Sequence, residues 1–405
     1  MIYDRTMFSK RIYADYASTT PISRDVSCAM RRAQIYGNPS AIYKEGVEAK
    51  KVLEEARAAA ARAIESRPEE IFFTSGGTES NNLAIAGVIE AKRKQGIPYE
   101  KIHVITTPIE HSSVLECIRE YEKRGVKVDF AEISSEGIVS VESIKRKINP
   151  DTVLVSVQYA NNEIGTIQPI HEIGEMIRVY KKEKGTGPIF HSDACQAPLF
   201  LSLHRENLRV DLLSLDGHKI YGPRGVGILF IKNGTKIEPI LFGGGQEKGL
   251  RSTTENISGI VGMAAALRQA QGKRLDFSAR MKLLRDFFIS EVEKNFPEAI
   301  LNGSREKRLP NNANFSFPWI SDAEFAVISL DAHGIACSTK SSCLAGAEES
   351  YVVRALDSKN PWRAKSTLRF TFGIKNSRYD MIKIVKMLKK LKDNLGKSSA
   401  IAKNI

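Results

Sequence analysis

The sequence predicts an α/β protein in which a mostly parallel, seven-stranded sheet forms a large domain, followed by a smaller α+β domain. The chain has 405 residues, and because one hydrophobic core stops growing near ~250–300 residues, two domains are expected. Short apolar runs alternate with helical patterns up to about residue 260, and the pattern changes there. We therefore assign residues 12–260 to the large domain and residues 261–405, with 1–11, to the small one.

The large domain is predicted from its alternating strands and helices. Helical patterns lie between the apolar runs, at Glu45–Ser66, Ser80–Gln95, Ser113–Arg124 and Ile170–Lys184. Such alternation favours parallel strands with helices on both faces, and ligands of these folds bind beyond the carboxyl ends of the strands. The predicted strands are Ile71–Thr74, Ile102–Thr106, Val126–Phe130, Thr152–Gln158, Pro188–His191, Val210–Leu215 and Gly227–Ile231.

The second half begins with two predicted helices, Ile260–Gly272 and Phe277–Asn295, and a mixed α+β segment follows them. From Asn376 to the end, apolar residues recur at helical spacing and lysines dominate the opposite face. This helix carries six of the thirteen net positive charges. Nearly half of the net charge therefore lies on one helix, which fits a docking face better than a nucleic-acid groove, and direct nucleic-acid binding is not expected.

Composition narrows the class of protein. With 42% apolar and 26% charged residues, the chain is neither disordered nor collagen-like. Its five cysteines are scattered without a CxxC pair, which excludes a disulfide framework and fits a reducing compartment. No apolar run approaches the ~20 residues of a membrane span, and no signal peptide is visible at the start. A cytoplasmic protein without a membrane partner is expected.

Chemistry-bearing residues follow several of the predicted strands. Gly77 and Thr78 open a helix directly after a strand, where backbone N–H groups and the helix dipole can hold an anion, although a simple capped turn is an equal alternative. Lys219, beside His218, could form a Schiff base if its amine is partly desolvated, whereas most lysines are solvated.

Three further strands end in polar residues. Asp193 could pair with a protonated ring nitrogen or cap a helix, and His111 could stack on a ring or be purely structural. Asn162 follows the strand ending near Gln158. Taken together, a phosphate site, a ring-nitrogen acid, a stacking histidine and a Schiff-base lysine in one crevice are what pyridoxal 5′-phosphate requires.

Over nearly its whole length the sequence resembles the cysteine desulfurases of the fold-type I, class V aminotransferase family, particularly their first group. The resemblance implies the fold of the fold-type I pyridoxal-phosphate transferases and that cofactor. It also implies conversion of L-cysteine to L-alanine, with the sulfur passed to iron–sulfur cluster assembly or tRNA thiolation. The segments that carry it are Tyr13–Pro21, Gly37–Ser40, Gly77–Glu79, Asn161–Gly165, Gly217–Pro223, Gly243–Glu247 and Ser366–Phe370.

The resemblance also implies residue roles. Lys219 would hold the cofactor and move the substrate's α-proton, Asp193 would pair with the ring nitrogen, and His111 would stack on the ring. Arg369 would grip the substrate carboxylate as a two-pronged donor. Gln196 would contact the phenolic oxygen of the cofactor, and Asn162 would lie beside cofactor and substrate. The phosphate would be held by Gly77, Thr78 and His218. Thr254 would contact the phosphate in a neighbouring subunit, which implies a homodimer.

Cys343 is the implied nucleophile, and its polar setting between Ser338 and Gly346 separates it from Cys337, which we expect to be a core residue. Its thiolate would carry the persulfide. Lys340, where the family has glycine, is expected to lower the pKa of Cys343. No resident metal site is expected, but Cys343 is a candidate ligand of a transient [2Fe–2S] cluster shared with a scaffold.

Two further departures leave alternatives open. Asp216 stands where the family has a phosphate-binding serine or threonine, so we expect weakened cofactor retention. Thr253 replaces a glycine beside Thr254. A selenocysteine lyase or another class V enzyme is the alternative within enzymes, and a degraded dimeric scaffold homologue is the alternative outside them.

Overall fold

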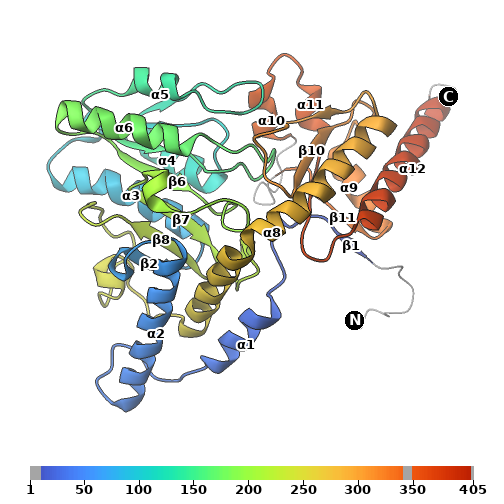
Figure 1. Cartoon of the computed structure of the whole chain (residues 1–405). Helices are drawn as coiled ribbons and strands as arrows, with labels where there is room; N and C mark the ends of the chain where they lie inside the picture. Colours follow the sequence, from blue (N-terminus) through green and yellow to red (C-terminus); the bar gives the residue numbers. More distant parts are fainter. Residues whose placement is uncertain (1–10, 341–348, 403–405) are drawn as a thin grey trace.

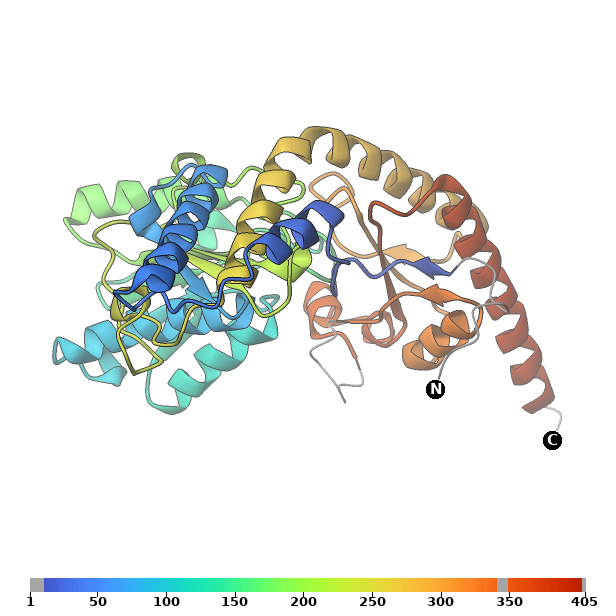
Figure 2. The same ribbon diagram turned by 90° about the horizontal axis from the view of Figure 1, so that it is seen from below.

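The computed structural model describes residues 11–340 and 349–402, and Figure 1 shows their arrangement. A seven-stranded sheet with its covering helices forms one part of the molecule. A second, smaller group of strands and helices lies beside it. The long helix α8 (Ile257–Asn295) runs from one part to the other, as the turned view in Figure 2 makes plain.

The large sheet has the strand order β2-β8-β7-β6-β5-β3-β4. Strand β8 is antiparallel to both of its neighbours, and the other pairings are parallel. The predicted seven-stranded, mostly parallel sheet is therefore confirmed. Its strands are β2 (Ile71–Thr74), β3 (His103–Thr106), β4 (Lys127–Phe130), β5 (Thr152–Ser156), β6 (Ile189–Asp193), β7 (Leu212–Asp216) and β8 (Gly227–Ile231).

Side-chain alternation along the strands divides the packing between the two faces of the sheet. In β2, Ile71 and Phe73 pack into one core and Phe72 into the other. Helices α2 (Lys44–Ala63), α6 (Ile170–Lys184) and the start of α8 cover the first face. Helices α3 (Gly77–Lys94) and α4 (Ser112–Lys123) cover the second. Because both faces are covered, strands such as β2 and β8 are mainly apolar, which is why they were recognisable in the sequence.

The smaller part is built around an antiparallel sheet, β9 (Ile300–Leu301), β10 (Asn312–Ser316) and β12 (Thr367–Thr371). The N-terminal strand β1 (Ile12–Tyr13) pairs in parallel with β11 (Ile335–Ala336), so Ile12 packs in this second core. The remaining helices are α1 (Arg24–Arg32), α5 (Val141–Lys147), α7 (Arg205–Leu208), α9 (Ala323–Ala332), α10 (Tyr351–Leu356), α11 (Trp362–Lys365) and α12 (Arg378–Ala402).

Helix α8 corrects one prediction, because the two helices expected around residues 260–295 are one continuous helix of 39 residues. The stretch after Gly272 contains no proline, and a single exposed glycine costs only about 1 kcal/mol in a helix. Residues Ile260–Leu267 of α8 pack in the core of the large sheet, whereas Met281–Val292 pack in the second core. The domain boundary at residue 260 stays a prediction, and it falls inside this helix.

The lysine-rich C-terminal helix is α12, and it docks by its apolar side as predicted. Met381, Ile384 and Leu388 are buried in the second core, while Lys386, Lys389 and Lys390 are exposed. Among the described residues, no helix combines the length and apolarity needed to cross a membrane.

Candidate active site

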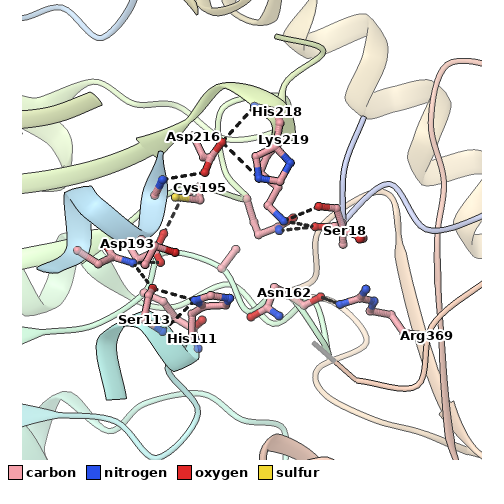
Figure 3. Close-up of a pocket in the computed structure, with 17 residues that line it drawn as sticks. Ser18, His111, Ser113, Asn162, Asp193, Cys195, Asp216, His218, Lys219 and Arg369 are labelled. Atoms are coloured by element: carbon pink, nitrogen blue, oxygen red, sulfur yellow. Dashed lines mark hydrogen bonds and ion pairs between the residues drawn. The ribbon is translucent and has the colours of Figure 1, made fainter. Parts of the chain in front are cut away.

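The carboxyl ends of β2, β3, β5, β6 and β7 meet at one edge of the large sheet, since these strands run in the same direction. A cavity of about 140 Å³ lies at this edge. Figure 3 shows the side chains that converge on it. The cavity is thus where ligands of such folds are expected to bind.

Most of the predicted site residues meet in this cavity. Thr254, in contrast, is exposed in the loop before α8 and is not among the lining residues, so its role toward a neighbouring subunit stays a prediction. Cys343 lies outside the described residues. The predicted residues that line the cavity are Gly77, Thr78, His111, Asn162, Asp193, Gln196, Asp216, His218, Lys219 and Arg369.

Lys219 ends the short 3₁₀ helix η3 (Gly217–Lys219), which directly follows β7. Its Nζ donates to the carbonyl oxygens of Ala17 at 2.8 Å and Ser18 at 2.7 Å. Ala17 also accepts a hydrogen bond from Gln196 at 3.0 Å. The segment at Ala17–Ser18, which the sequence analysis did not assign to the site, therefore positions two predicted cofactor residues.

Asp193, the last residue of β6, is held by two donors. Asn81 Nδ2 donates to one carboxylate oxygen at 2.8 Å, and the backbone N–H of Cys195 donates to the other at 2.9 Å. Asn81 lies one turn into α3, so it reaches β6 only through the packing of that helix on the sheet. The sequence alone does not reveal this contact with Asp193.

His111 is the N-cap of α4, and its ring orientation follows from its contacts. Nδ1 accepts from the backbone N–H of Ser113 at 3.2 Å and lies 2.8 Å from the Ser113 hydroxyl. Because Nδ1 accepts, we assign the proton of the neutral imidazole to Nε2. The ring is thus fixed at the cavity wall by its own helix.

Glu110 precedes the cavity residue His111 in the chain and does not itself line the cavity, and the sequence analysis gave it no role. It is completely buried, and burial raises its pKa to about 8. One carboxyl oxygen accepts from Thr107 Oγ1 at 2.7 Å and from the backbone N–H of Gln158 at 3.0 Å. The other oxygen has no hydrogen-bond partner within the described part of the chain. No local sequence signal announces this, because the burial arises from tertiary packing.

Arg369, on β12, brings the second part of the molecule to the cavity. It is 1% exposed and donates to Asp15 Oδ1 at 2.7 Å and to the Asn162 carbonyl oxygen at 2.9 Å. Its Nε is buried without a partner among the described residues. The guanidinium therefore retains a donor after its two protein contacts are made.

Asp216 ends β7 and turns toward the start of α3. It accepts from the backbone N–H of Gly77 at 2.7 Å and from that of His218 at 3.1 Å, and His218 Nε2 lies 3.4 Å away. Burial alone would raise the pKa of Asp216, but the hydrogen bonds and charge of His218 and the Gly77 N–H lower it overall. A Cβ on Gly77 would lie 2.6 Å from the sulfur of Cys195, so only glycine fits there.

A family model described as aminotransferase class-V matches residues 12–384. The chain belongs to the aminotransferase class-V family. The cysteine desulfurase IscS of Dictyoglomus turgidum is 40% identical to this class-V chain over 389 residues, 95% of each protein. That of Clostridium botulinum (strain Hall) is 41% identical over 388 residues, 95% of this chain and 94% of the relative.

A solved structure titled NifS-like protein aligns with a TM-score of 0.85 and 34% identity. It covers 96% of this class-V chain and 100% of its own. The predicted family, the resemblance to cysteine desulfurases and the fold class are therefore confirmed.

The surroundings of the two C-terminal cysteines bear on one further prediction. Cys337 is buried in the second core and burial raises its pKa, which agrees with an inert core thiol. Lys340 is also buried, and its Nζ donates to Glu324 of α9 at 2.8 Å. That ion pair reduces the field its ammonium exerts elsewhere, and the expected effect of Lys340 on Cys343 stays a prediction.

Proposed function

We propose that the protein is a pyridoxal-phosphate-dependent cysteine desulfurase, which converts L-cysteine to L-alanine and leaves the sulfur as a persulfide on Cys343. The relatives' names support this activity. The observation that carries the proposal is the convergence of Lys219, Asp193 and Arg369, from three separate strands or strand ends, on one cavity that His111 also lines.

The residues of the cavity fit pyridoxal 5′-phosphate in all but one respect. An amine, a carboxylate held by two donors and an imidazole line one space, and the glycine cradle at Gly77 lies at the N-terminus of α3. The exception is Asp216, whose negative charge lies in that cradle. When bound, the cofactor supplies an aldehyde and a ring that stabilises negative charge at the substrate's α-carbon.

The chain's own residues would perform the remaining work. The carboxylate of Asp193, oriented by Asn81, would hold a proton on the ring nitrogen. The Nζ of Lys219 would take the proton from the substrate's Cα and return it later. Arg369 has a free Nε–H, and its guanidinium would bind the substrate carboxylate and fix the orientation of the Cα–H bond.

The sulfur step balances without a further reactant. The carbon–sulfur bond of L-cysteine breaks, and its sulfur forms a sulfur–sulfur bond with the Cys343 thiolate. The carbon that loses sulfur takes up a proton, so that L-alanine leaves and Cys343 holds a persulfide. The role of Cys343 rests on the sequence, because this residue lies outside the described part of the chain.

The partners of this reaction belong to the same proposal. We infer a homodimer, in which Thr254 reaches the neighbouring subunit, and a sulfur acceptor such as an iron–sulfur scaffold or a tRNA-thiolation protein. The exposed lysines of α12 offer a face for an acidic acceptor. We infer that the protein acts in the reducing cytoplasm.

Alanine release from L-cysteine, in the presence of a thiol reductant, tests the activity. We expect Cys343→Ser to abolish release while cofactor absorbance remains, and Lys219→Ala to remove both. Cys28→Ser is the matched control, because Cys28 is half-buried on α1, away from the cavity, and should leave release unchanged.

The alternatives give different results in the same assay. Alanine release from L-selenocysteine but not from L-cysteine would indicate a selenocysteine lyase. Absence of cofactor absorbance in the wild-type protein, even after excess pyridoxal 5′-phosphate is added, would indicate a scaffold homologue and end the enzyme proposal.

A further inference from the structure

Asp216 places a negative charge where the cavity is built to receive an anion. Its carboxylate accepts the N–H of Gly77, the first residue of α3, at 2.7 Å, and Asp216 is 7% exposed. A Cβ on Gly76 would lie 3.1 Å from the same carboxylate oxygen, so the carboxylate rests directly against the glycine turn. It therefore occupies the end of the helix dipole that attracts negative charge.

Other donors of this turn are also engaged. The backbone N–H of Ser75 donates to Glu79 at 2.8 Å, and Glu79 is paired with Arg251 at 2.8 Å. His218 directs both its backbone N–H and its Nε2 toward Asp216. Carboxylates of the chain thus already accept hydrogen bonds from the N–H groups of Ser75 and Gly77. The imidazole of His218, which is predicted to hold a phosphate, already lies against Asp216.

We propose that Asp216 makes this site select its cofactor mainly by the pyridine ring and aldehyde, with the phosphate group adding little to binding. This rests on the proposed function, since it concerns the same cofactor. A phosphate entering the cradle must either displace the carboxylate from Gly77 or lie beside it. The first costs the hydrogen bond of the carboxylate and the second brings two negative charges together, so both offset the binding free energy that the helix N-terminus contributes to phosphate. The contacts of Asp193 and Lys219 lie elsewhere in the cavity and are unaffected.

The test compares two probes that share the ring and aldehyde and differ in the phosphate, pyridoxal 5′-phosphate and pyridoxal. Dissociation constants for both are measured on the full-length apo-protein by absorbance titration, and thermal shift supplies a second readout. In the wild type we expect the two constants to differ by less than about tenfold. In Asp216→Ser and Asp216→Asn, tighter binding of the phosphorylated probe should widen the difference by roughly tenfold or more.

Asp211→Asn is the matched control. Asp211 is another buried aspartate that accepts a backbone N–H, that of Phe190, but it pairs with Lys181 and lies outside the cavity lining. Its substitution should leave the ratio of the two constants at the wild-type value. Circular dichroism of each variant checks that the fold is retained.

Two results would overturn the inference. One is that the wild-type protein binds the phosphorylated probe hundreds of times more tightly than it binds pyridoxal. This result can be observed without any variant. The other is an unchanged ratio in both Asp216 variants, which would mean that the carboxylate turns away when phosphate enters. Failure of both probes to bind the wild type would instead contradict the proposed function.

Discussion

Glu110 directly precedes His111, which lines the cavity, and its buried surroundings determine its protonation state. Its carboxyl group is completely buried between Thr107 and the backbone N–H of Gln158, and Asp193 lies near enough to raise its pKa further. At neutral pH the group is therefore largely protonated. It adds hydrogen-bonding capacity beside His111 without adding a second negative charge near Asp193.

Substitution of Glu110 by glutamine should flatten the pH dependence of stability. Between the ordinary pKa of 4.5 and about 8, the unfolded chain has lost the Glu110 proton and the folded chain keeps it. This group's contribution is thus fully present below 4.5 and lost as pH rises through about 8, at roughly 1.4 kcal/mol per pH unit. Denaturant unfolding at several pH values in that window should show the decline in wild type and a smaller one in Glu110→Gln.

Glu120→Gln is the control for that comparison, since Glu120 is an exposed glutamate of α4, the helix that follows Glu110. It should retain the wild-type decline. Equal slopes in wild type and Glu110→Gln would show that Glu110 is already ionised in the folded protein.

Arg369 gives a second prediction at this scale. In the wild type, the forked guanidinium of Arg369 contacts Asp15 and the Asn162 carbonyl and keeps its Nε–H unpaired among the described residues. Arg369→Lys keeps the positive charge but loses this forked arrangement of donors. We expect KM for L-cysteine to rise about tenfold or more, with a smaller effect on kcat, in steady-state assays of alanine release.

Arg363→Lys supplies the comparison, because Arg363 pairs with Asp357 outside the cavity lining and should leave KM unchanged. A wild-type KM in Arg369→Lys would remove Arg369 from the substrate site. A lowered Tm with unchanged KM would assign it a structural role alone.

Helix α8 joins the two hydrophobic cores, because it is one continuous helix that packs into both of them. Gly272 lies mid-helix, exposed, with nothing within 4 Å of an added Cβ. Gly272→Ala should therefore raise the free energy of unfolding by ~0.5–1 kcal/mol, through lower backbone entropy in the unfolded chain. Denaturant titration measures the change.

Gly234 is the matched position with the opposite expectation. An added Cβ there also meets nothing within 4 Å, but φ is +88°. Gly234→Ala should destabilise by ~1–2 kcal/mol, because a side chain strains that backbone conformation. If both substitutions changed the free energy of unfolding in the same direction, the space available to the new side chain, and not the backbone conformation, would control the outcome.

The elements also show what the sequence could and could not predict. Buried strands such as β2 and β8 are apolar on both faces, so their runs stood out, and the glycine turn at Gly77 marked the start of α3. The continuity of α8 was missed because Gly272 and the polar residues after it resemble a helix end. The contact of Asn81 with Asp193 was missed because it depends on how α3 packs on the sheet.

At the scale of the whole molecule, the cavity belongs to both parts of the fold. Arg369 comes from β12 in the smaller part, and its partner Asp15 follows β1, which pairs with β11 of that part. The other predicted residues that line the cavity come from the edge of the large sheet. A ligand that contacts both sets would stabilise the joint between the parts, by an amount that grows with its concentration relative to Kd.

An exposed apolar surface suggests how two such molecules would meet. Ile42 is 96% exposed and Phe242 is 83% exposed. Chain segments that lie close to them in sequence, Pro39–Ser40 and 244–248, line one common hollow. Large exposed apolar surface marks interaction sites, and Thr254, with its predicted role across subunits, is exposed as well.

We expect the double variant Ile42→Asp with Phe242→Asp to be monomeric, and the wild type dimeric, in size-exclusion chromatography with light scattering. Buried carboxylates without partners would oppose association. Leu275→Asp, at a 78% exposed position on α8, should leave the dimer intact. A dimeric double variant would place the interface elsewhere, and a monomeric wild type would exclude sites shared between subunits.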